Sequence, residues 1–553
     1  MVAGEGIIVN FAFMKRFLII IALAAVTLSS GAQSKSFKLG KWTEIQGAIL
    51  KELNRSYVDS LPLDRIERAG VDAMLSDLDP YTVYIPEEEN ENLRMMINKS
   101  YGGIGAIIYK PDLQGNVIIN EPYENSPAHK AGLRCGDEIL TIDGLSVKGL
   151  SSAECSEKMR GTPGSKVLFK VKKVYSGEIK DVRITRQTIH LPDLQYVGMV
   201  TPNTGYILQT GFTEGVADQL RKAIIALQKS SKLDTLVLDL RGNGGGLLNE
   251  AVDIVSLFVP KGSLVVTAKG REEGSSYAAR TTKAPLDTKL PLIIMVDSGS
   301  ASASEIVSGA LQDMDRAIII GTRTFGKGLV QSLRPLPYGG QLKLTTAKYY
   351  TPSGRCVQAI DYSHRNEDGS VGQIPDSLTH EFKTALGRTV RDGGGITPDI
   401  EVKPHDYSRL TYSLVLSGVV EQYALEYVKA HQSIPATSDF SLSEADYEDF
   451  IKFAKGKEFD YRSSARTYFD LVRKELVRDG LEEAMSKELD ALGKALDMEK
   501  EDFLRLKKDE IVPFIEEEIV VRYYFQPAGV QLRLRYDTQL QEALRKAAGF
   551  KFE

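Results

Sequence analysis

Three apolar strands, each followed by a loop of small or polar residues, constrain the fold of this chain most strongly. Continuous apolar runs predict strands at Thr235–Leu240, Leu292–Val296 and Ala317–Gly321. Helical patterns follow the first two strands, over Leu247–Phe258 and Ser302–Gln312. Such alternation is typical of a parallel or mixed sheet, whose right-handed crossovers bring the loops to one edge. We therefore expect residues in the three loops to converge.

These loops contain a glycine run, a serine and a lysine, namely Gly244–Gly246, Ser302 and Lys327. A serine hydroxyl is a poor nucleophile until a base removes its proton, and no histidine follows a strand of this sheet. Lys327 lies among apolar residues and glycines. Because burial disfavours an ammonium, this lysine is a candidate base. Gln331, four residues further on, is placed to hydrogen-bond the lysine amine.

Acyl transfer also needs N–H donors for the developing oxyanion. The candidates are the backbone amides of Ala303, at the start of a helix, and of Gly245 and Gly246. Ser302 can also be interpreted as a helix cap and not as a nucleophile, because Ser302 and Glu305 have the spacing of a capping box. On local sequence alone, the two interpretations are equally supported.

Composition excludes several classes of function. The 553 residues carry a net charge of −5 without a basic tract, so nucleic acid is not an expected partner. Three cysteines in unrelated contexts and six histidines without ligand spacing predict no disulfide framework, no metal and no cofactor. The stretch GTRTFGKG is similar to a phosphate-binding P-loop, but Gly328 occupies the position where that motif needs Ser or Thr. Nucleotide binding is therefore not expected.

The N-terminus is typical of a secretory signal peptide. Lys15 and Arg16 precede the apolar run Phe17–Leu28, which is shorter than the about 20 residues of a membrane span. Small residues follow, and Ser30-x-Ala32 fits a cleavage site. We expect a signal peptide over 1–32, with Met14 as an alternative start. After its cleavage we expect an exported, periplasmic protein that has no stable membrane span and is soluble or peripheral to the membrane.

Residues 101–187 contain short β-type runs separated by glycines. The loop Gly103-Ile104-Gly105 precedes a strand, and SPAHKAGLRCGDEILTIDG follows further on. This segment resembles a PDZ domain, in which loop N–H groups bind a terminal carboxylate and the next strand edge accepts an extended peptide. Gly103, Ile104 and Gly105 are therefore expected to bind the substrate's C-terminal carboxylate.

The motifs together resemble those of the carboxyl-terminal processing peptidases, also called tail-specific proteases. The matching stretches, in the family's order across roughly residues 40–405, are DPYTVYIP, the PDZ signature, LVLDLRGNGGGLL, SASASEIVSGALQD, GTRTFGKGLVQ and YYTPSGR. The resemblance implies a serine endopeptidase in which Ser302 is the nucleophile and Lys327, 25 residues later, is the base. It also implies that Gln331 completes the site, that Ala303 and the Gly244–Gly246 loop supply the oxyanion donors, and that Ser300 and Ser304 are structural.

The implied fold is multidomain α/β, with a ClpP/crotonase-like sheet and helices, an inserted PDZ domain, and helical N- and C-terminal segments. After the signal peptide, the expected domains are a helical segment (38–100), the PDZ domain (101–187), the protease core (188–405) and a helical region (406–553). The role of residues 410–525 stays open, because they extend past the family's usual closing segment, to which YDTQLQEALRKA is similar.

Expected partners are protein or peptide substrates with free C-termini, with an adaptor or a second copy of the chain as further options. The alternative function is a catalytically inactive, PDZ-bearing scaffold that binds peptides.

Overall fold

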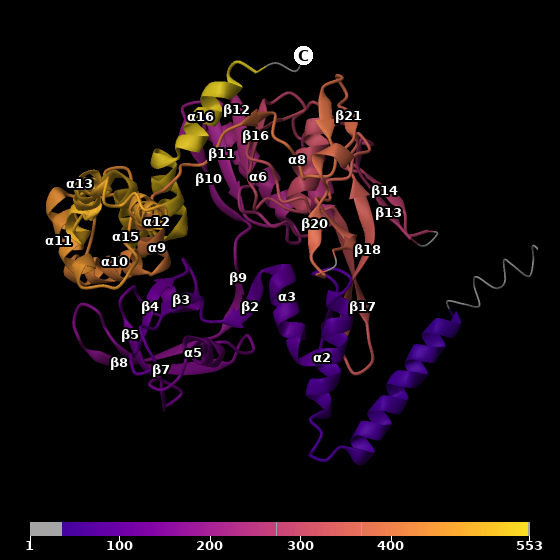
Figure 1. Ribbon diagram of the computed structural model, residues 1–553, viewed down its shortest axis with the longest axis horizontal. Helices are drawn as coiled ribbons and strands as arrows, with labels where there is room; N and C mark the ends of the chain where they lie inside the picture. Colours follow the sequence, from indigo (N-terminus) through magenta and orange to yellow (C-terminus); the bar gives the residue numbers. More distant parts are fainter. Residues whose placement is uncertain (1–35, 272–273, 367, 551–553) are drawn as a thin grey trace, which may run out of the picture. The chain divides into compact units, whose positions relative to one another are not determined.

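The computed structural model describes residues 36–271, 274–366 and 368–550 (Figure 1). The expected signal peptide, 1–32, lies outside these ranges. The chain divides into two compact units, of which the first ends at Tyr84 and the second begins at Ile85. In the first unit, a helix over 36–56 is followed by α2 (Leu63–Ser76). Within the described ranges, we find no helix that is both long enough and apolar enough to cross a membrane.

The second unit is built around a six-stranded sheet. Its strands, in spatial order, are β10 (Leu194–Thr201), β11 (Thr204–Gln209), β12 (Thr235–Asp239), β15 (Leu292–Val296), β16 (Ile318–Gly321) and β23 (Ile400–Glu401). The first pair is antiparallel and all the others are parallel. The structure therefore confirms the three predicted strands and their parallel arrangement, which brings the following loops to one edge of the sheet.

Both faces of this sheet are buried, which is why its strands are continuously apolar. One face packs against α6 (Val216–Ser230), α7 (Leu248–Val255) and α8 (Ala303–Asp313). Leu236 and Leu238 point toward these helices, whereas Val237 points to the other face, as expected for alternating strand residues.

The other face of the sheet is covered by the end of the chain. Val530 in α15 (Lys508–Tyr536) and Leu540 and Ala543 in α16 (Thr538–Ala547) belong to the same buried cluster as Val237. The stretch YDTQLQEALRKA is therefore part of the core around the six-stranded sheet, although it lies more than a hundred residues beyond the last strand of that sheet.

A second, antiparallel sheet lies beside the first. It contains β17 (Leu329–Pro335), β18 (Gln341–Tyr350), β13 (Leu264–Gly270) and β14 (Tyr277–Arg280), paired in that order. Two small hairpins follow, β19–β20 (Ile360–Arg365 and Val371–Gln373) and β21–β22 (Glu381–Lys383 and Thr389–Arg391).

The segment that resembles a PDZ domain, residues 101–187, has its own sheet and core. Its strands, in spatial order, are β3 (Ala106–Tyr109), β4 (Val117–Pro122), β5 (Glu138–Ile142), β7 (Lys166–Lys172) and β8 (Ile179–Thr185), with β6 (Leu145–Ser146) beside β5. Helices α4 (Pro127–Lys130) and α5 (Ser152–Met159) complete it. The chain enters from α3 (Asn90–Asn98) along β2 (Ser100–Gly103) and leaves along β9 (Gln187–His190), and these two strands pair.

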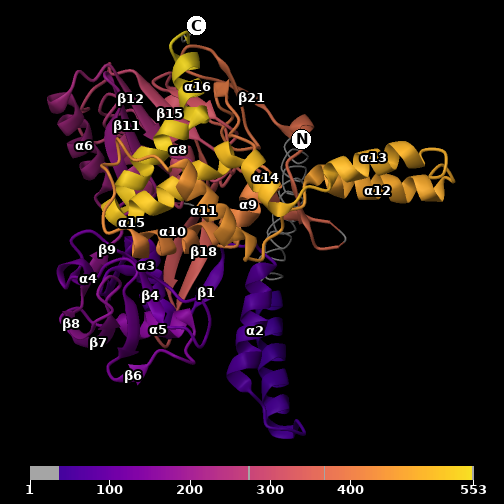
Figure 2. The same ribbon diagram turned by 90° about the vertical axis from the view of Figure 1, so that its left-hand side faces the viewer.

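The C-terminal region is helical, as predicted. Before α15 it contains α9 (Arg409–Leu416), α10 (Val419–Ala430), α11 (Glu444–Lys455), α12 (Ser464–Arg478), α13 (Ser486–Leu496) and α14 (Lys500–Leu506). Most of these helices share one apolar core, and Figure 2 shows the α12–α13 hairpin extending away from the others. Helix α15 is kinked at Phe525, where φ is 66°, two residues before Pro527.

Helix α15 also contacts the PDZ domain. The Arg522 guanidinium donates to Asn120 Oδ1 at 2.7 Å, and Gln526 Nε2 donates to Glu121 Oε2 at 2.6 Å. Burial raises the pKa of Glu121 above its ordinary value, although these polar contacts oppose the shift. Helix α15 therefore contacts both this segment and the second face of the six-stranded sheet.

Candidate active site

One cavity of about 470 Å³ gathers the residues that the sequence placed in three separate loops. Gly244–Gly246, Ser302, Lys327 and Gln331 all line it. The convergence follows from the parallel order of β12, β15 and β16, because their carboxyl ends lie at one edge.

Ser302 lies at the sharp turn between β15 and α8. Its backbone has φ 55° and ψ −110°, in a region that non-glycine residues rarely occupy. Strained backbone of this kind persists only where the surrounding structure enforces it, and it is concentrated at functional sites. The turn leaves Ser302 partly exposed on the cavity wall while the residues on either side of it are buried.

The two flanking serines attach this turn to the loop after β12. Ser300 Oγ donates to the Leu240 carbonyl and Ser304 Oγ donates to the Asn243 carbonyl, each at 2.8 Å. Both side chains are fully buried. Their hydroxyls are thus engaged in backbone contacts, in agreement with the structural role expected for them.

The glycine loop lies directly against Ser302. A Cβ atom on Gly245 would lie 2.7 Å from the Ala301 carbonyl oxygen and 2.9 Å from Ser302 Cβ, so a larger residue would displace the turn. Gly245 also has φ 100°, which favours glycine.

The three expected oxyanion donors differ in their hydrogen bonds. The Gly245 N–H donates to Asn243 Oδ1 at 2.9 Å and is therefore engaged. The N–H groups of Ala303 and Gly246 donate no hydrogen bond to any described residue. An engaged amide cannot serve an oxyanion without first breaking its bond, so the geometry favours Ala303 and Gly246, and the oxyanion role of all three amides stays a prediction.

Glu305 connects the serine turn to the lysine loop. Its buried carboxylate accepts hydrogen bonds from the N–H groups of Ser302 at 2.8 Å, Gly326 at 2.7 Å and Lys327 at 2.9 Å, and from Thr324 Oγ1 at 2.7 Å. Burial raises the pKa of Glu305, and these hydrogen bonds oppose the shift. From the sequence, Glu305 is assigned only as a helix cap; its contact with Ser302 is real, but the same carboxylate also orders the lysine loop.

Tyr349 makes a second connection between the two loops. Its buried hydroxyl donates to the Lys327 carbonyl at 2.7 Å and lies 3.2 Å from the Ser302 carbonyl. Burial raises its pKa well above the ordinary value, so it stays protonated and able to donate. Sequence reasoning missed this residue, although YYTPSGR was among the matching stretches.

Gln331 lies on β17, at the same cavity as Lys327. Its Nε2 donates to Thr345 Oγ1 on β18 at 3.2 Å, which orients the amide from the neighbouring strand. The expected contact between Gln331 and the lysine amine stays a prediction.

A second predicted site lies in the PDZ domain. Gly103, Ile104 and Gly105 line a cavity of about 230 Å³ between the edge strand β3 and α5. The N–H groups of Ile104 and Gly105 donate to no described residue, which leaves them available to an anion. Arg160 lies in the same cavity, with its guanidinium 5.2 Å from the centre of the Tyr101 ring. The arrangement suits a peptide carboxylate.

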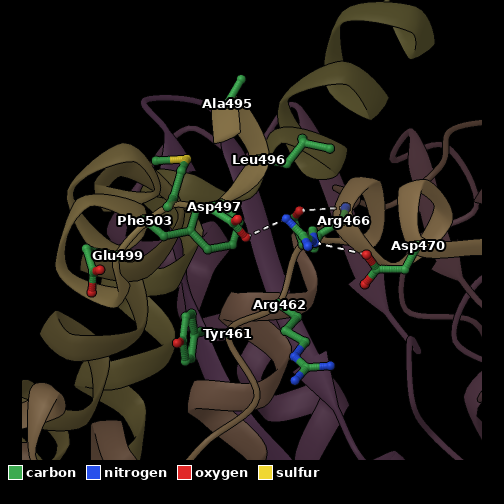
Figure 3. Close-up of a pocket in the computed structure, with 11 residues that line it drawn as sticks. Tyr461, Arg462, Arg466, Asp470, Ala495, Leu496, Asp497, Glu499 and Phe503 are labelled. Atoms are coloured by element: carbon green, nitrogen blue, oxygen red, sulfur yellow. Dashed lines mark hydrogen bonds and ion pairs between the residues drawn. The ribbon is translucent and has the colours of Figure 1, made fainter. Parts of the chain in front are cut away.

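A further cavity, of about 440 Å³, lies in the helical region and is polar (Figure 3). Arg466 lines this cavity, and its guanidinium is already paired with Asp470 and Asp497. None of the predicted catalytic residues lies in it. The described residues also contain no group of His, Cys, Asp and Glu arranged to hold a metal ion.

Replacing Glu305 by glutamine tests its positioning role. The amide NH₂ would face N–H donors, so we expect at least one loop contact to be lost. The expected result is a loss of about 1–3 kcal/mol in the free energy of unfolding and a fall in kcat of about tenfold or more. Denaturant titration and steady-state kinetics measure the two effects.

Glu250→Gln is the matched control. This buried carboxylate on α7 also accepts two backbone N–H bonds, from Gly215 at 2.8 Å and Ala217 at 3.1 Å, but it does not line the cavity that contains Ser302 and Lys327. It should lose comparable stability and keep its kcat. Equal kcat losses in both variants would assign Glu305 a general structural role only.

Three protein-family models match most of the second unit. Residues 203–363 match "Peptidase family S41", residues 118–173 match "PDZ domain", and residues 410–546 match "Probable PDZ-protease, C-terminal helical domain". The last match covers the region whose role the sequence analysis left open.

The chain is also similar to individual known proteins. The chain is 36% identical over 354 residues to the "Carboxy-terminal-processing protease" of Bartonella bacilliformis, covering 63% of this chain and 78% of that one. It is 33% identical over 315 residues to the "Probable CtpA-like serine protease" of Staphylococcus aureus, covering 56% of this chain and 61% of that one. The solved photosystem II D1 C-terminal processing protease is 25% identical with a TM-score of 0.35, over 64% of this chain and 91% of that chain.

Proposed function

The chain belongs to the carboxy-terminal-processing protease family of serine peptidases, and we propose that it cleaves unfolded or tagged proteins with a Ser302–Lys327 dyad. The observation that carries the proposal is the shared cavity, where Ser302, Lys327 and the glycine loop meet. Neither a cap nor a scaffold requires a strained serine and two unengaged amides beside a lysine.

In the proposed reaction, the neutral Lys327 amine takes the Ser302 Oγ proton while the oxygen attacks the peptide carbonyl. The carbonyl oxygen becomes negative and accepts hydrogen bonds from the Ala303 and Gly246 amides. Lys327 then gives its proton to the leaving amine, which breaks the C–N bond and leaves an acyl-enzyme. Water, activated by the same amine, hydrolyses the ester and restores Ser302.

We further propose that the PDZ groove binds the substrate's free C-terminus. The unengaged Ile104 and Gly105 amides and the Arg160 guanidinium favour a carboxylate, and the edge strand β3 favours an extended peptide. An N-terminal signal peptide over 1–32 would place the enzyme outside the cytoplasm, in the periplasm.

The experiment compares one unfolded reporter with an apolar C-terminal residue as free acid and as amide. The acid should be cleaved about tenfold or more faster at low substrate concentration, because amidation removes one charged hydrogen-bond acceptor. Mass spectrometry of the fragments gives rate and position together.

Equal rates for acid and amide would remove tail capture from the proposal and leave the peptidase activity in place. No cleavage of either form, together with binding of the free acid, would support the alternative of a peptide-binding scaffold.

A further inference from the structure

A partly buried ion pair lies beside the dyad and belongs to neither of its loops. Lys99, at the C-terminal end of α3, lines the catalytic cavity, and its Nζ is 3.1 Å from Asp193 Oδ1. The Asp193 carboxylate is 1% exposed. Lys99 Nζ also donates to the Thr210 carbonyl at 3.0 Å. A buried pair of this kind is costly to break, because the remaining charge loses its partner.

Lys99 and Asp193 both contact the backbone turn that follows β11. The second Asp193 oxygen accepts from the Thr213 hydroxyl and from the Thr213 N–H, the latter at 3.2 Å. A Cβ on Gly211 would lie 2.5 Å from Asp193 Oδ1 and would also meet Lys99 Nζ. The residues between Thr210 and Thr213 are therefore held by the ion pair on one side.

On its other side, this turn supports the glycine loop. The Phe212 carbonyl accepts from the Leu247 N–H at 2.8 Å, and a Cβ on Gly246 would lie 2.5 Å from that carbonyl oxygen. The position of the Gly246 amide thus depends on Phe212, and Phe212 lies between the two residues that Lys99 and Asp193 hold.

We propose that Lys99 and Asp193 are positioning residues that set the oxyanion hole by fixing the turn under Gly246. This inference rests on the proposed function, since it concerns the same reaction. Neither side chain is required to touch the substrate. Because an oxyanion donor must lie within a few tenths of an ångström of its place, a relaxed turn should slow the chemical step while substrate binding stays nearly constant.

The test uses Asp193→Asn and Lys99→Met in the full chain, with Lys99→Arg as the conservative variant. Each is assayed for kcat and KM, and for binding of a peptide aldehyde and of the matching peptide alcohol. The aldehyde forms a hemiacetal whose oxygen occupies the oxyanion hole, whereas the alcohol cannot. Melting temperature confirms that each variant is folded.

We expect Asp193→Asn and Lys99→Met to lose about 10- to 100-fold in kcat and in aldehyde affinity, with KM and alcohol affinity within about twofold. Lys99→Arg should recover most of the loss. Asp399→Asn is the matched control: Asp399 is a buried carboxylate that pairs with Arg388 and accepts the Ile319 N–H at 2.8 Å, away from the cavity. It should leave all four quantities within about twofold.

Unchanged kcat and aldehyde affinity in a folded Asp193→Asn protein would overturn the inference. So would an equal loss of aldehyde and alcohol affinity, which would indicate a general distortion of the cavity. If Asp193→Asn does not fold, the comparison of Lys99→Met with Lys99→Arg decides. A wild-type chain without cleavage dependent on Ser302 would instead reject the proposed function itself.

Discussion

Ser302→Ala is expected to lower kcat/KM by about 10⁴- to 10⁶-fold, because the acyl-enzyme route needs the hydroxyl oxygen that the substitution removes. The fold should survive, since the neighbouring Ser300 and Ser304 still bind the carbonyls of Leu240 and Asn243. Cleavage of the unfolded reporter by wild type and variant, followed by mass spectrometry, measures the loss.

Ser308→Ala is the control for this substitution. Ser308 lies on α8, the helix that begins directly after Ser302. It is fully buried, and its hydroxyl donates to the Ser304 carbonyl at 2.8 Å. Its loss should cost about 1 kcal/mol of stability and change kcat/KM by no more than about twofold. If Ser302→Ala were as mild as Ser308→Ala, the capping interpretation of Ser302 would replace the nucleophilic one.

Lys327→Ala should lower kcat/KM by about 10³-fold or more, because the serine then has no base. Lys327→Arg is the sharper variant. A guanidinium keeps the positive charge and most of the length, but it stays protonated at any working pH and cannot accept the serine proton. We expect both variants to be inactive at neutral pH, as measured with the same reporter.

The pH profile separates a base from a fixed charge. A lysine acts as a base only when neutral, so wild-type kcat/KM should rise as pH increases until the amine is fully deprotonated, and residual activity in Lys327→Arg should lack that rise. A profile that falls from acid to neutral pH, or near wild-type activity in Lys327→Arg, would contradict the assignment of Lys327 as the base.

The central sheet and the meeting of its loops could be predicted from sequence because both follow from local pattern and chain topology. Continuous apolar runs of strand length identify β12, β15 and β16, and the handedness of their connections brings Ser302 and Lys327 to one edge. The catalytic roles of these residues stay predictions until the variants are measured.

The second face of the sheet could not be assigned in this way. An apolar helix face indicates that something covers it, but not which element does so. The partners of Val237 turn out to be Leu540 and Ala543, about three hundred residues later in the chain. Likewise, nothing in the pattern of α15 indicates that Arg522 binds Asn120 of the PDZ domain.

The contacts of the polar residues around the site could not be predicted for a related reason. The spacing of Glu305 from Ser302 is fully explained by a helix cap. Its hydrogen bonds from Gly326 and Lys327 therefore have no separate pattern in the sequence. Lys99 and Asp193 are single charged residues without a motif. They are far apart in the sequence, so only the folded chain brings them together.

The hydrogen bonding of the glycine amides depends on a local side-chain contact. Gly245 lies two residues after Asn243, whose side chain accepts from its N–H as in an Asx turn, whereas the Gly246 N–H is unengaged. A glycine run indicates where a backbone can approach closely, without indicating which N–H points into the cavity.

Trapping the acyl-enzyme identifies the nucleophile. An activated ester of an apolar peptide, mixed with the enzyme and quenched in acid within the first turnover, should leave the acyl group on the wild-type chain. After digestion, mass spectrometry should locate this adduct on Ser302, and Lys327→Ala should form it far more slowly. An adduct on another side chain, or formed at the wild-type rate in Ser302→Ala, would contradict the central claim that Ser302 is the nucleophile.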